Sequence, residues 1–253
     1  MADTPPLYVP PDAVKFILFQ RTQYLFFRRN PFMRRLASFL PRRLAYALET
    51  LFTKFDALVS LEARAAKKRI IELFSEEMHR EYQELRSHLP ERVAAILDVG
   101  CGIGGIDAFL AKHYEHSCPA IHLLDRTEMP HKVYYGIEKK ASFYNSLALA
   151  KKFLVGNGVK EEQIITQEAN DDNRISIDGR FDLVVSLISW GFHYPVSTYL
   201  DQVYEKMNPG GVLIIDVRRV PQHDSMEEIR KKFGNLEVIR AAGKHARVVA
   251  RKT

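Results

Sequence analysis

The sequence has few cysteines and no long apolar run, and each shortage argues against a class of protein. Cys101 and Cys118 are the only cysteines among 253 residues. Two cysteines provide neither a disulfide framework nor the spacing of a zinc site, and they suit a reducing cytosol. No apolar stretch approaches the ~18 residues that span a bilayer. The start, MADTPP, also lacks the basic and apolar parts of a signal peptide, so we expect a cytoplasmic protein.

Acidic residues are missing from residues 13–48, which carry eight lysines and arginines within a chain of net charge +6. Bulky apolar side chains lie between these cations, and Pro31 and Pro41 divide the stretch into short helices. Amphipathic patterns then continue to about residue 88. The sequence therefore predicts a basic helical region over residues 1–88 and a separate domain over residues 89–253.

Three interpretations of this basic region are open. The simplest is a helical cap that covers the second domain. A second adds peripheral contact of residues 13–48 with the cytoplasmic membrane face, where each basic residue contributes about 1 kcal/mol. Nucleic-acid binding would use the same charge, but no recognised RNA- or DNA-binding motif is present, and we predict no nucleic-acid partner. The sequence leaves the oligomeric state open.

The second domain is organised around a glycine-rich turn. Residues 94–97 form a short apolar run, and the turn Gly100-Cys101-Gly102-Ile103-Gly104-Gly105 follows. Apolar residues then recur at helical spacing from Ile106. Strand, glycine turn and helix are the opening unit of a nucleotide-binding α/β sheet, in which glycine lets the ligand approach the backbone.

Two kinds of ligand compete for this turn. Gly100, Gly102 and Gly105 fit the dinucleotide pattern G-x-G-x-x-G, which alone is a weak signal. Arg126, after the next predicted strand, would suit a 2′-phosphate. Asp98 favours a different ligand, because a carboxylate beside the turn repels a pyrophosphate and attracts a cation.

The stretch Asp98-x-Gly100-x-Gly102-x-Gly104 resembles motif I of the class I S-adenosylmethionine-dependent methyltransferases. The run FDLVVS at residues 181–186 is similar to the fourth strand of that family, and Asn208-Pro209-Gly210-Gly211 is similar to the turn before its fifth strand. Two short strands near the C-terminus would add one antiparallel strand. The resemblance covers residues 90–253 and implies an α/β fold with a seven-stranded, mostly parallel Rossmann-like sheet and an N-terminal helical extension.

The resemblance also implies which residues hold the cofactor, S-adenosylmethionine. The turn glycines would approach the methionine and ribose portions, Asp98 would hold the amino-acid end, and Asp125 would bind the ribose hydroxyls. The turn after the third strand would meet the adenine ring, and the end of the fourth strand would lie beside the transferable methyl group. The complete set of cofactor-binding candidates is Asp98, Gly100, Cys101, Gly102, Gly104, Asp125, Arg126, Asn170, Asp171, Ser186 and Leu187.

His193 and Tyr194 are the catalytic candidates. An imidazole with a pKa near 6.5 suits a general base for a substrate hydroxyl, and Tyr194 is an alternative hydrogen-bonding group. Packing is the competing role for His193. The loop 127–145, which holds His131, Lys132, Tyr134, Tyr135 and Tyr144, is a candidate substrate wall. Asp171, Asp172 and Asp216 have no diagnostic metal spacing, and no metal is predicted.

We therefore expect a methyltransferase that acts on a hydroxyl of a small-molecule, sugar or lipid-linked acceptor. The chain lacks the Pro-Cys pair of cytosine C5 enzymes and the Asn/Asp-Pro-Pro-aromatic motif of DNA amino-methylating enzymes. The tracts His193-Tyr194-Pro195 and Tyr144-Asn145-Ser146 loosely resemble sugar O-methyltransferases. The alternatives are N- or carboxyl-methylation of a natural product or lipid, and a non-catalytic methyltransferase-like subunit that binds a partner.

Overall fold

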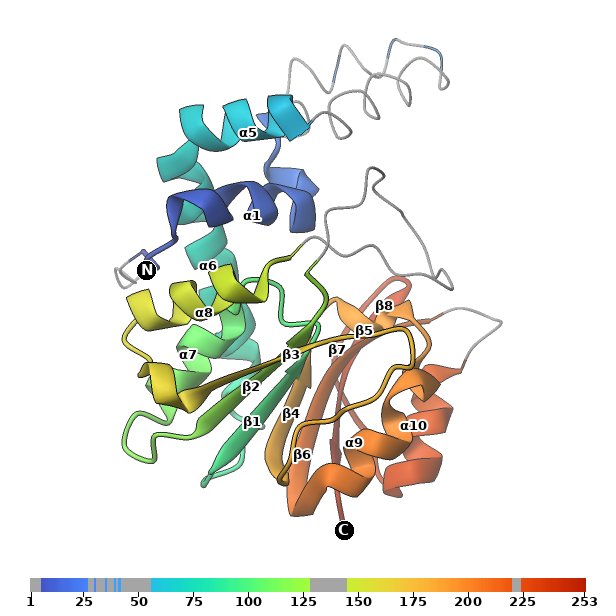
Figure 1. The fold of residues 1–253 in the computed structure, drawn as a ribbon. Helices are drawn as coiled ribbons and strands as arrows, with labels where there is room; N and C mark the ends of the chain where they lie inside the picture. The colour runs from blue at the N-terminus through green and yellow to red at the C-terminus, as the bar shows by residue number, and fades with distance from the viewer. Residues whose placement is uncertain are drawn as a thin grey trace.

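The computed structural model describes residues 6–26, 30, 35, 39, 41, 56–127, 145–219 and 224–253. In this part of the chain, helices cover both faces of a central sheet, and helices of the N-terminal region extend beyond one edge of it (Figure 1). Among the described helices, none combines the length and apolarity that a membrane span requires.

Within the described residues, seven strands form one sheet in the order β3-β2-β1-β4-β6-β8-β7. The first five in this order run parallel, and β8 is antiparallel to both of its neighbours. This confirms the predicted mostly parallel sheet with one reversed strand. The strands are β1 (Ala95–Val99), β2 (Ala120–Asp125), β3 (Ile164–Glu168), β4 (Phe181–Ser186), β6 (Met207–Arg218), β7 (Glu237–Ala242) and β8 (His245–Arg251).

The strand order reverses direction at β1. The chain passes from β1 outward to β2 and β3, and then returns to β4 on the other side of β1. Parallel sheets bind ligands at such a switch point, outside the carboxyl ends of the strands. The glycine turn that follows β1 therefore lies where the topology opens the sheet.

Helices cover the two faces of the sheet with separate apolar cores. One face packs against the C-terminal helices through Leu200, Val203, Ile229 and Phe233. The other packs against α6 and α7 through Leu85, Ile106 and Leu110, among others. The helices are α6 (Lys67–Leu85), α7 (Gly105–His113), α8 (Leu147–Gly156), α9 (Leu200–Lys206) and α10 (Ser225–Phe233). Four 3-10 turns, η1 (Pro11–Ala13), η2 (Thr22–Tyr24), η3 (Glu161–Gln163) and η4 (Val196–Thr198), complete the helical elements named here.

The sequence also predicts helices over about residues 63–88 and over residues 142–155, and the structure changes three of the predicted boundaries. The predicted turn Asn208–Gly211 lies within β6, because Met207 pairs with Phe181 and the backbone of Gly211 accepts a hydrogen bond from Lys252. The helix predicted from residue 142 begins at Leu147, where the hydroxyl of Ser146 caps it. The predicted helix 63–88 is interrupted at Ala66, which separates α5 (Asp56–Ala65) from α6.

The first helices pack against the rest of the protein. In α1 (Val14–Gln20), Val14, Phe16, Ile17 and Leu18 are buried in a core shared with α5, α6 and α8. The apolar side chains of residues 13–19 are therefore directed inward. Most of the basic residues on which the membrane prediction depends, including Arg28, Arg29, Arg34, Arg42 and Arg43, lie outside the described residues, and that contact stays a prediction.

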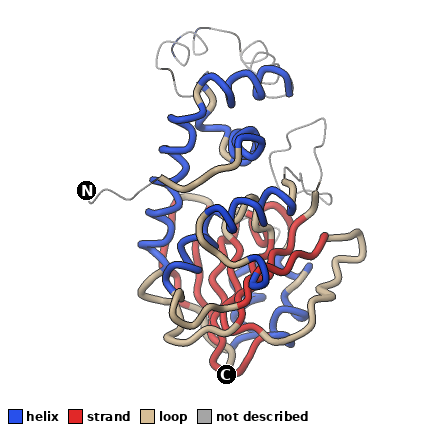
Figure 2. The backbone as a smooth tube through the Cα atoms, turned by 60° about the vertical axis from the view of Figure 1, so that its left-hand side comes forward, coloured by secondary structure: helices blue, strands red, loops and turns tan. Residues whose placement is uncertain are grey.

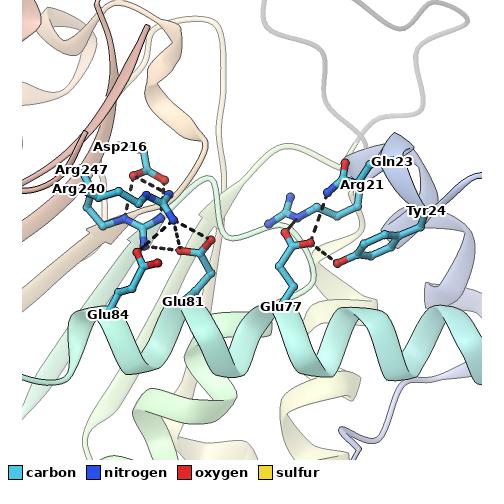
Figure 3. A network of polar contacts seen from close by, with 9 residues as sticks. All are labelled: Arg21, Gln23, Tyr24, Glu77, Glu81, Glu84, Asp216, Arg240 and Arg247. Carbon is cyan, nitrogen blue, oxygen red and sulfur yellow. Dashed lines mark hydrogen bonds and ion pairs between the residues drawn. The ribbon is translucent and has the colours of Figure 1, made fainter. Parts of the chain in front are cut away.

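Helix α6 runs from α1 and α5 down beside the sheet, as two views show (Figures 1 and 2). Three glutamates along α6 contact different parts of the chain (Figure 3). Glu77 accepts hydrogen bonds from Arg21 (2.8 Å) and from the hydroxyl of Tyr24. Glu81 and Glu84 meet arginines of the C-terminal strands. One helix therefore fixes the first and last segments of the chain relative to each other.

The centre of the second contact is Arg247 on β8, which is fully buried. Its Nε and Nη2 each donate to Asp216 on β6 at 2.8 Å, and its Nη1 donates to Glu81. Arg240 on β7 adds contacts to Glu81 at 3.3 Å and Glu84 at 3.1 Å. The Arg247–Asp216 pair is bidentate and buried. Removing one partner would leave an uncompensated buried charge, which is costly.

Replacing Arg247 with Met leaves the buried carboxylate of Asp216 uncompensated. We expect the free energy of unfolding to fall by about 3–5 kcal/mol, as measured by urea denaturation followed by circular dichroism. Arg230→Met is the matched control, because Arg230 pairs with Glu227 at 2.8 Å on the surface of α10 with half of its side chain exposed. The control should change stability by less than about 1 kcal/mol. Equal effects of the two substitutions would contradict this account.

Candidate functional site

The glycine turn is a backbone loop with little room for side chains. Gly100, Gly102 and Gly104 all adopt positive φ, at 79°, 57° and 80°. A Cβ on Gly100 would lie 1.7 Å from the Ser189 hydroxyl, and one on Gly102 would lie 2.8 Å from Oε1 of Gln20. Both the backbone conformation and the crowding therefore require glycine here. Gly104 caps the start of α7.

Gly105, the fourth glycine of the stretch, has a different role. A Cβ there would lie 2.5 Å from the ring of Phe74 and 2.7 Å from the sulfur of Met78, both on α6. Gly105 thus lets α6 approach the start of α7. Gly105 is the third glycine of the dinucleotide pattern, where that residue allows close packing of a helix. A packing role of this kind does not distinguish a dinucleotide site from a methyltransferase site.

Asp125, at the end of β2, holds the turn from beneath. Its Oδ2 accepts from the backbone N–H of Gly102 at 2.7 Å, and its Oδ1 accepts from that of Arg126 at 2.7 Å. Burial raises the pKa of Asp125 to about 6, although these two donors favour the charged form. Each carboxylate oxygen keeps a further lone pair, so Asp125 can still accept a ligand hydroxyl.

Cys101 and Asn145 close the space beside Asp125. The thiol of Cys101 lies 3.9 Å from Oδ2 of Asp125 and 3.9 Å from the amide nitrogen of Asn145. Burial raises the pKa of Cys101 well above its usual value, which keeps the thiol protonated. Cys101 is therefore a neutral, buried thiol at this position. The substrate-wall residues 128–144, with His131, Lys132, Tyr134, Tyr135 and Tyr144, lie outside the described residues.

Two buried carboxyl groups flank the turn on its other side. Asp98 belongs to β1, and Asp107 belongs to the first turn of α7. Oδ1 of Asp98 and both oxygens of Asp107 have no hydrogen-bond partner among the described residues. Burial raises the pKa of both groups. The pKa of Asp98 lies well above the ordinary range of an aspartate, and the pKa of Asp107 is about 6. Negative groups without a counter-charge favour a cationic ligand.

A tight turn joins β4 to β5 (Ser189–Tyr194). Strand β5 lies outside the seven-stranded order, and the sequence did not predict it. Ile188 at this corner has a φ of 55°, which is costly for a β-branched residue. The buried Ser186 hydroxyl donates to Val99 at 2.7 Å and accepts from Trp190 at 3.0 Å. The hydroxyl of Ser186 is thus used within the chain, to hold the corner against β1, and half-buried Leu187 packs on the core.

Strand β5 brings both catalytic candidates to the carboxyl edge of the sheet. Burial raises the pKa of Tyr194, the charges of Asp125 and Asp98 raise it further, and a hydrogen bond with Ser189 lowers it. Tyr194 thus lies near Ser189, whose hydroxyl would meet a Cβ on Gly100. His193, the preceding residue, is partly exposed, and its ring meets the edge of Phe192 at 5.1 Å.

The predicted adenine contacts lie at the outer side of this edge. Asn170 and Asp171 are exposed in the turn after β3. Arg126 forms an ion pair with Asp171 at 2.8 Å. An Arg126 held by a carboxylate is less available to a 2′-phosphate than the sequence suggested.

The three carboxylates considered for a metal do not form a site. Asp216 is held by Arg247, and Asp171 is held by Arg126. Among the described residues, no group of three His, Cys, Asp or Glu side chains is placed to bind a metal ion.

Sequence reasoning missed Gln20, Asp107 and Ser189. Asp107 carried a signal, because an acid three residues into the helix after a glycine turn lies close to that turn. Gln20 and Ser189 carried none, since their positions depend on how the cap and β5 fold back onto Gly102 and Gly100. Asn145 was within the candidate substrate wall, and the structure places it against Cys101 instead.

Residues 74–253 match the family model described as a methyltransferase domain. The match covers well over half of the chain, so the protein belongs to this methyltransferase family. S-adenosylmethionine is the methyl donor that the class I methyltransferase fold binds. No curated protein gave a significant match to the sequence.

Solved structures with similar folds include three methyltransferases. A 16S rRNA methyltransferase from T. thermophilus, in complex with AdoMet and guanosine, is 17% identical with a TM-score of 0.44, and the match covers 72% of this chain but 42% of that one. A methyltransferase from Pyrococcus furiosus is 15% identical (TM-score 0.47; 69% and 82% covered). The N-methyltransferase NodS from Bradyrhizobium japonicum is 17% identical (TM-score 0.46; 71% and 87% covered).

Gly102 and Gly243 provide a matched test of the turn, because both have a φ of 57° but only Gly102 is crowded. We expect Gly102→Ala and Gly243→Ala each to lower the free energy of unfolding by about 1–2 kcal/mol, because alanine is strained at a positive φ. Only Gly102→Ala should weaken binding of S-adenosylhomocysteine, by about tenfold or more, in calorimetric titrations. Unchanged affinity in Gly102→Ala would show that the ligand does not approach this turn.

Proposed function

We propose that this methyltransferase acts on a hydroxyl group of a small-molecule, sugar or lipid-linked acceptor. Bound S-adenosylmethionine supplies a methyl group that is activated by positively charged sulfur. The protein then has two tasks, which are to hold donor and acceptor in contact and to remove the acceptor proton.

The residues at the glycine turn fit this donor. The turn presents backbone rather than side chains at Gly100, Gly102 and Gly104, and the unpartnered Oδ1 of Asp98 suits the cationic amino-acid end. Asp125 keeps acceptor capacity for the ribose hydroxyls. A pyrophosphate would instead place two negative charges beside these carboxyl groups, so the charge arrangement supports a sulfonium donor over a dinucleotide.

On the acceptor side, the observation that carries the proposal is the position of His193. It lies between Phe192 and Tyr194 on β5, and its side chain is partly exposed. The imidazole is therefore accessible to a substrate at this strand. A neutral imidazole takes the hydroxyl proton as the oxygen becomes nucleophilic, and Tyr194 can orient the same oxygen.

The surroundings of Phe192 support an oxygen-rich acceptor. The guanidinium of Arg218, at the end of β6, lies 4.5 Å from the Phe192 ring, and the ring of His245 stacks on Phe192 at 4.7 Å. The Nε of Arg218 is buried and has no partner among the described residues. A buried donor of this kind needs an acceptor oxygen, which a sugar or a phosphate-linked lipid supplies.

His193→Ala tests the general base. Labelled S-adenosylmethionine is first incubated with metabolite and lipid extracts, and the methylated product is identified by mass spectrometry and NMR. With that acceptor, we expect His193→Ala to lower kcat by about 10²–10⁴-fold and to leave S-adenosylhomocysteine affinity unchanged. His116→Ala, at a side chain that is 96% exposed, is the control and should keep full activity.

Several outcomes separate this proposal from its alternatives. Full turnover by His193→Ala would remove the general-base role. A product methylated on nitrogen or on a carboxyl group would exclude the hydroxyl acceptor. A wild-type protein that binds neither S-adenosylmethionine nor S-adenosylhomocysteine would favour the non-catalytic subunit.

A further inference from the structure

The buried carboxyl pair Asp98–Asp107 is not explained by the fold. Asp98 is 3% exposed and Asp107 is 0% exposed. Three of their four oxygens have no hydrogen-bond partner among the described residues. Burying charged groups without partners costs several kcal/mol, and two hydrophobic residues would pack more favourably at these positions. The pair therefore needs a reason beyond stability.

The pair lies beside the part of the turn where a ligand approaches. Asp98 is two residues before Gly100, and Oδ2 of Asp107 would lie 3.6 Å from a Cβ on Gly104. Burial and the charge of Asp107 raise the pKa of Asp98, and the start of α7 favours the negative charge on Asp107. One proton between two carboxyl groups satisfies both at least cost.

The groups that face this pair are acidic or apolar. Asp125 on β2 contributes further negative charge, and the Cys101 thiol and the Tyr194 hydroxyl are neutral because burial raises their pKa values. Helices α6 and α8 present apolar side chains to the turn, among them Phe74, Met78 and Leu154. No described basic side chain compensates the pair, so a cation has to come from a ligand.

We infer that Asp107 is a positioning residue that shares one proton with Asp98 while the turn is empty, and that this proton is released when the donor's ammonium group binds. The inference rests on the donor-binding role proposed above. Before the donor binds, the pair holds one proton and carries a charge of −1. When one ammonium cation arrives, that proton leaves to solvent, and the charge of the pair becomes −2. Asp98 accepts from the ammonium group, and Asp107 holds Asp98 in place.

This arrangement also predicts how stability depends on pH. The pKa of Asp107 is about 6 in the folded protein and about 3.9 in the unfolded chain. The folded state therefore binds more protons between these values, and the buried charge costs stability above about pH 6. Without ligand, Asp107→Asn should raise Tm at pH 8 by about 2–4 °C, and the gap should shrink at pH 5. A residue that only supports the fold would instead lower Tm at both values.

The binding test compares two ligands that differ at one end. S-adenosylhomocysteine carries the ammonium group, and methylthioadenosine has the same nucleoside thioether without it. Each is titrated calorimetrically into the full chain at pH 7, in two buffers of different ionisation enthalpy, which counts released protons. We expect proton release with S-adenosylhomocysteine and none with methylthioadenosine.

Asp107→Asn should lose that proton release and bind S-adenosylhomocysteine about tenfold more weakly or worse, the effect of one hydrogen bond to a charged group. Its affinity for methylthioadenosine should stay within about twofold of wild type. Asp201→Asn is the matched control, because Asp201 is an exposed acid on α9 that pairs with Lys232. It should match wild type in all three measurements.

Unchanged S-adenosylhomocysteine affinity and proton release in Asp107→Asn would overturn the inference. The wild-type titrations test it even if that variant does not fold, since binding of both ligands without proton release overturns it as well. If wild type binds neither ligand, the donor-binding role fails, and the inference fails with it.

Discussion

Close approach at the glycine turn is the constraint on which the rest of the structure depends. The backbone at Gly100 and Gly102 is touched from two directions, by Ser189 at the start of β5 and by Gln20 at the end of α1. These two residues are distant in the chain, and both reach the turn because it has no side chains. The strained Ile188 corner and the packing of α1 in the shared core bring β5 and α1 to this one short loop.

Helix α6 makes this convergence possible. It packs against α7 where Gly105 allows a close approach, and its glutamates reach Arg21 in one direction and Arg247 in the other (Figure 3). A buried ion pair adds little net stability compared with apolar packing, but it specifies one arrangement strongly because each partner alone is costly. We therefore interpret the Arg247 network as the set of contacts that fixes the N-terminal helices relative to the last strands.

The site itself opposes stability. Asp98, Asp107 and Asp125 are all buried near one loop, and burial raises the pKa of each of them. A fold selected for stability alone would not gather three such groups without a basic partner. Proteins keep such arrangements where a ligand supplies the missing charge, and a buried acidic cluster beside a side-chain-free turn is consistent with a cationic methyl donor.

The sequence by itself determined the sheet and the turn, because their signals are local. Strand and helix periodicity, the glycine spacing and the Asp98 and Asp125 positions are each set by short-range rules, and β1 and β4 formed within two residues of their predicted bounds. Only the tertiary structure decided which side chains meet that turn. The contacts of Gln20 and Ser189 join distant segments, and no local spacing encodes a contact that two elements make only after they have packed together.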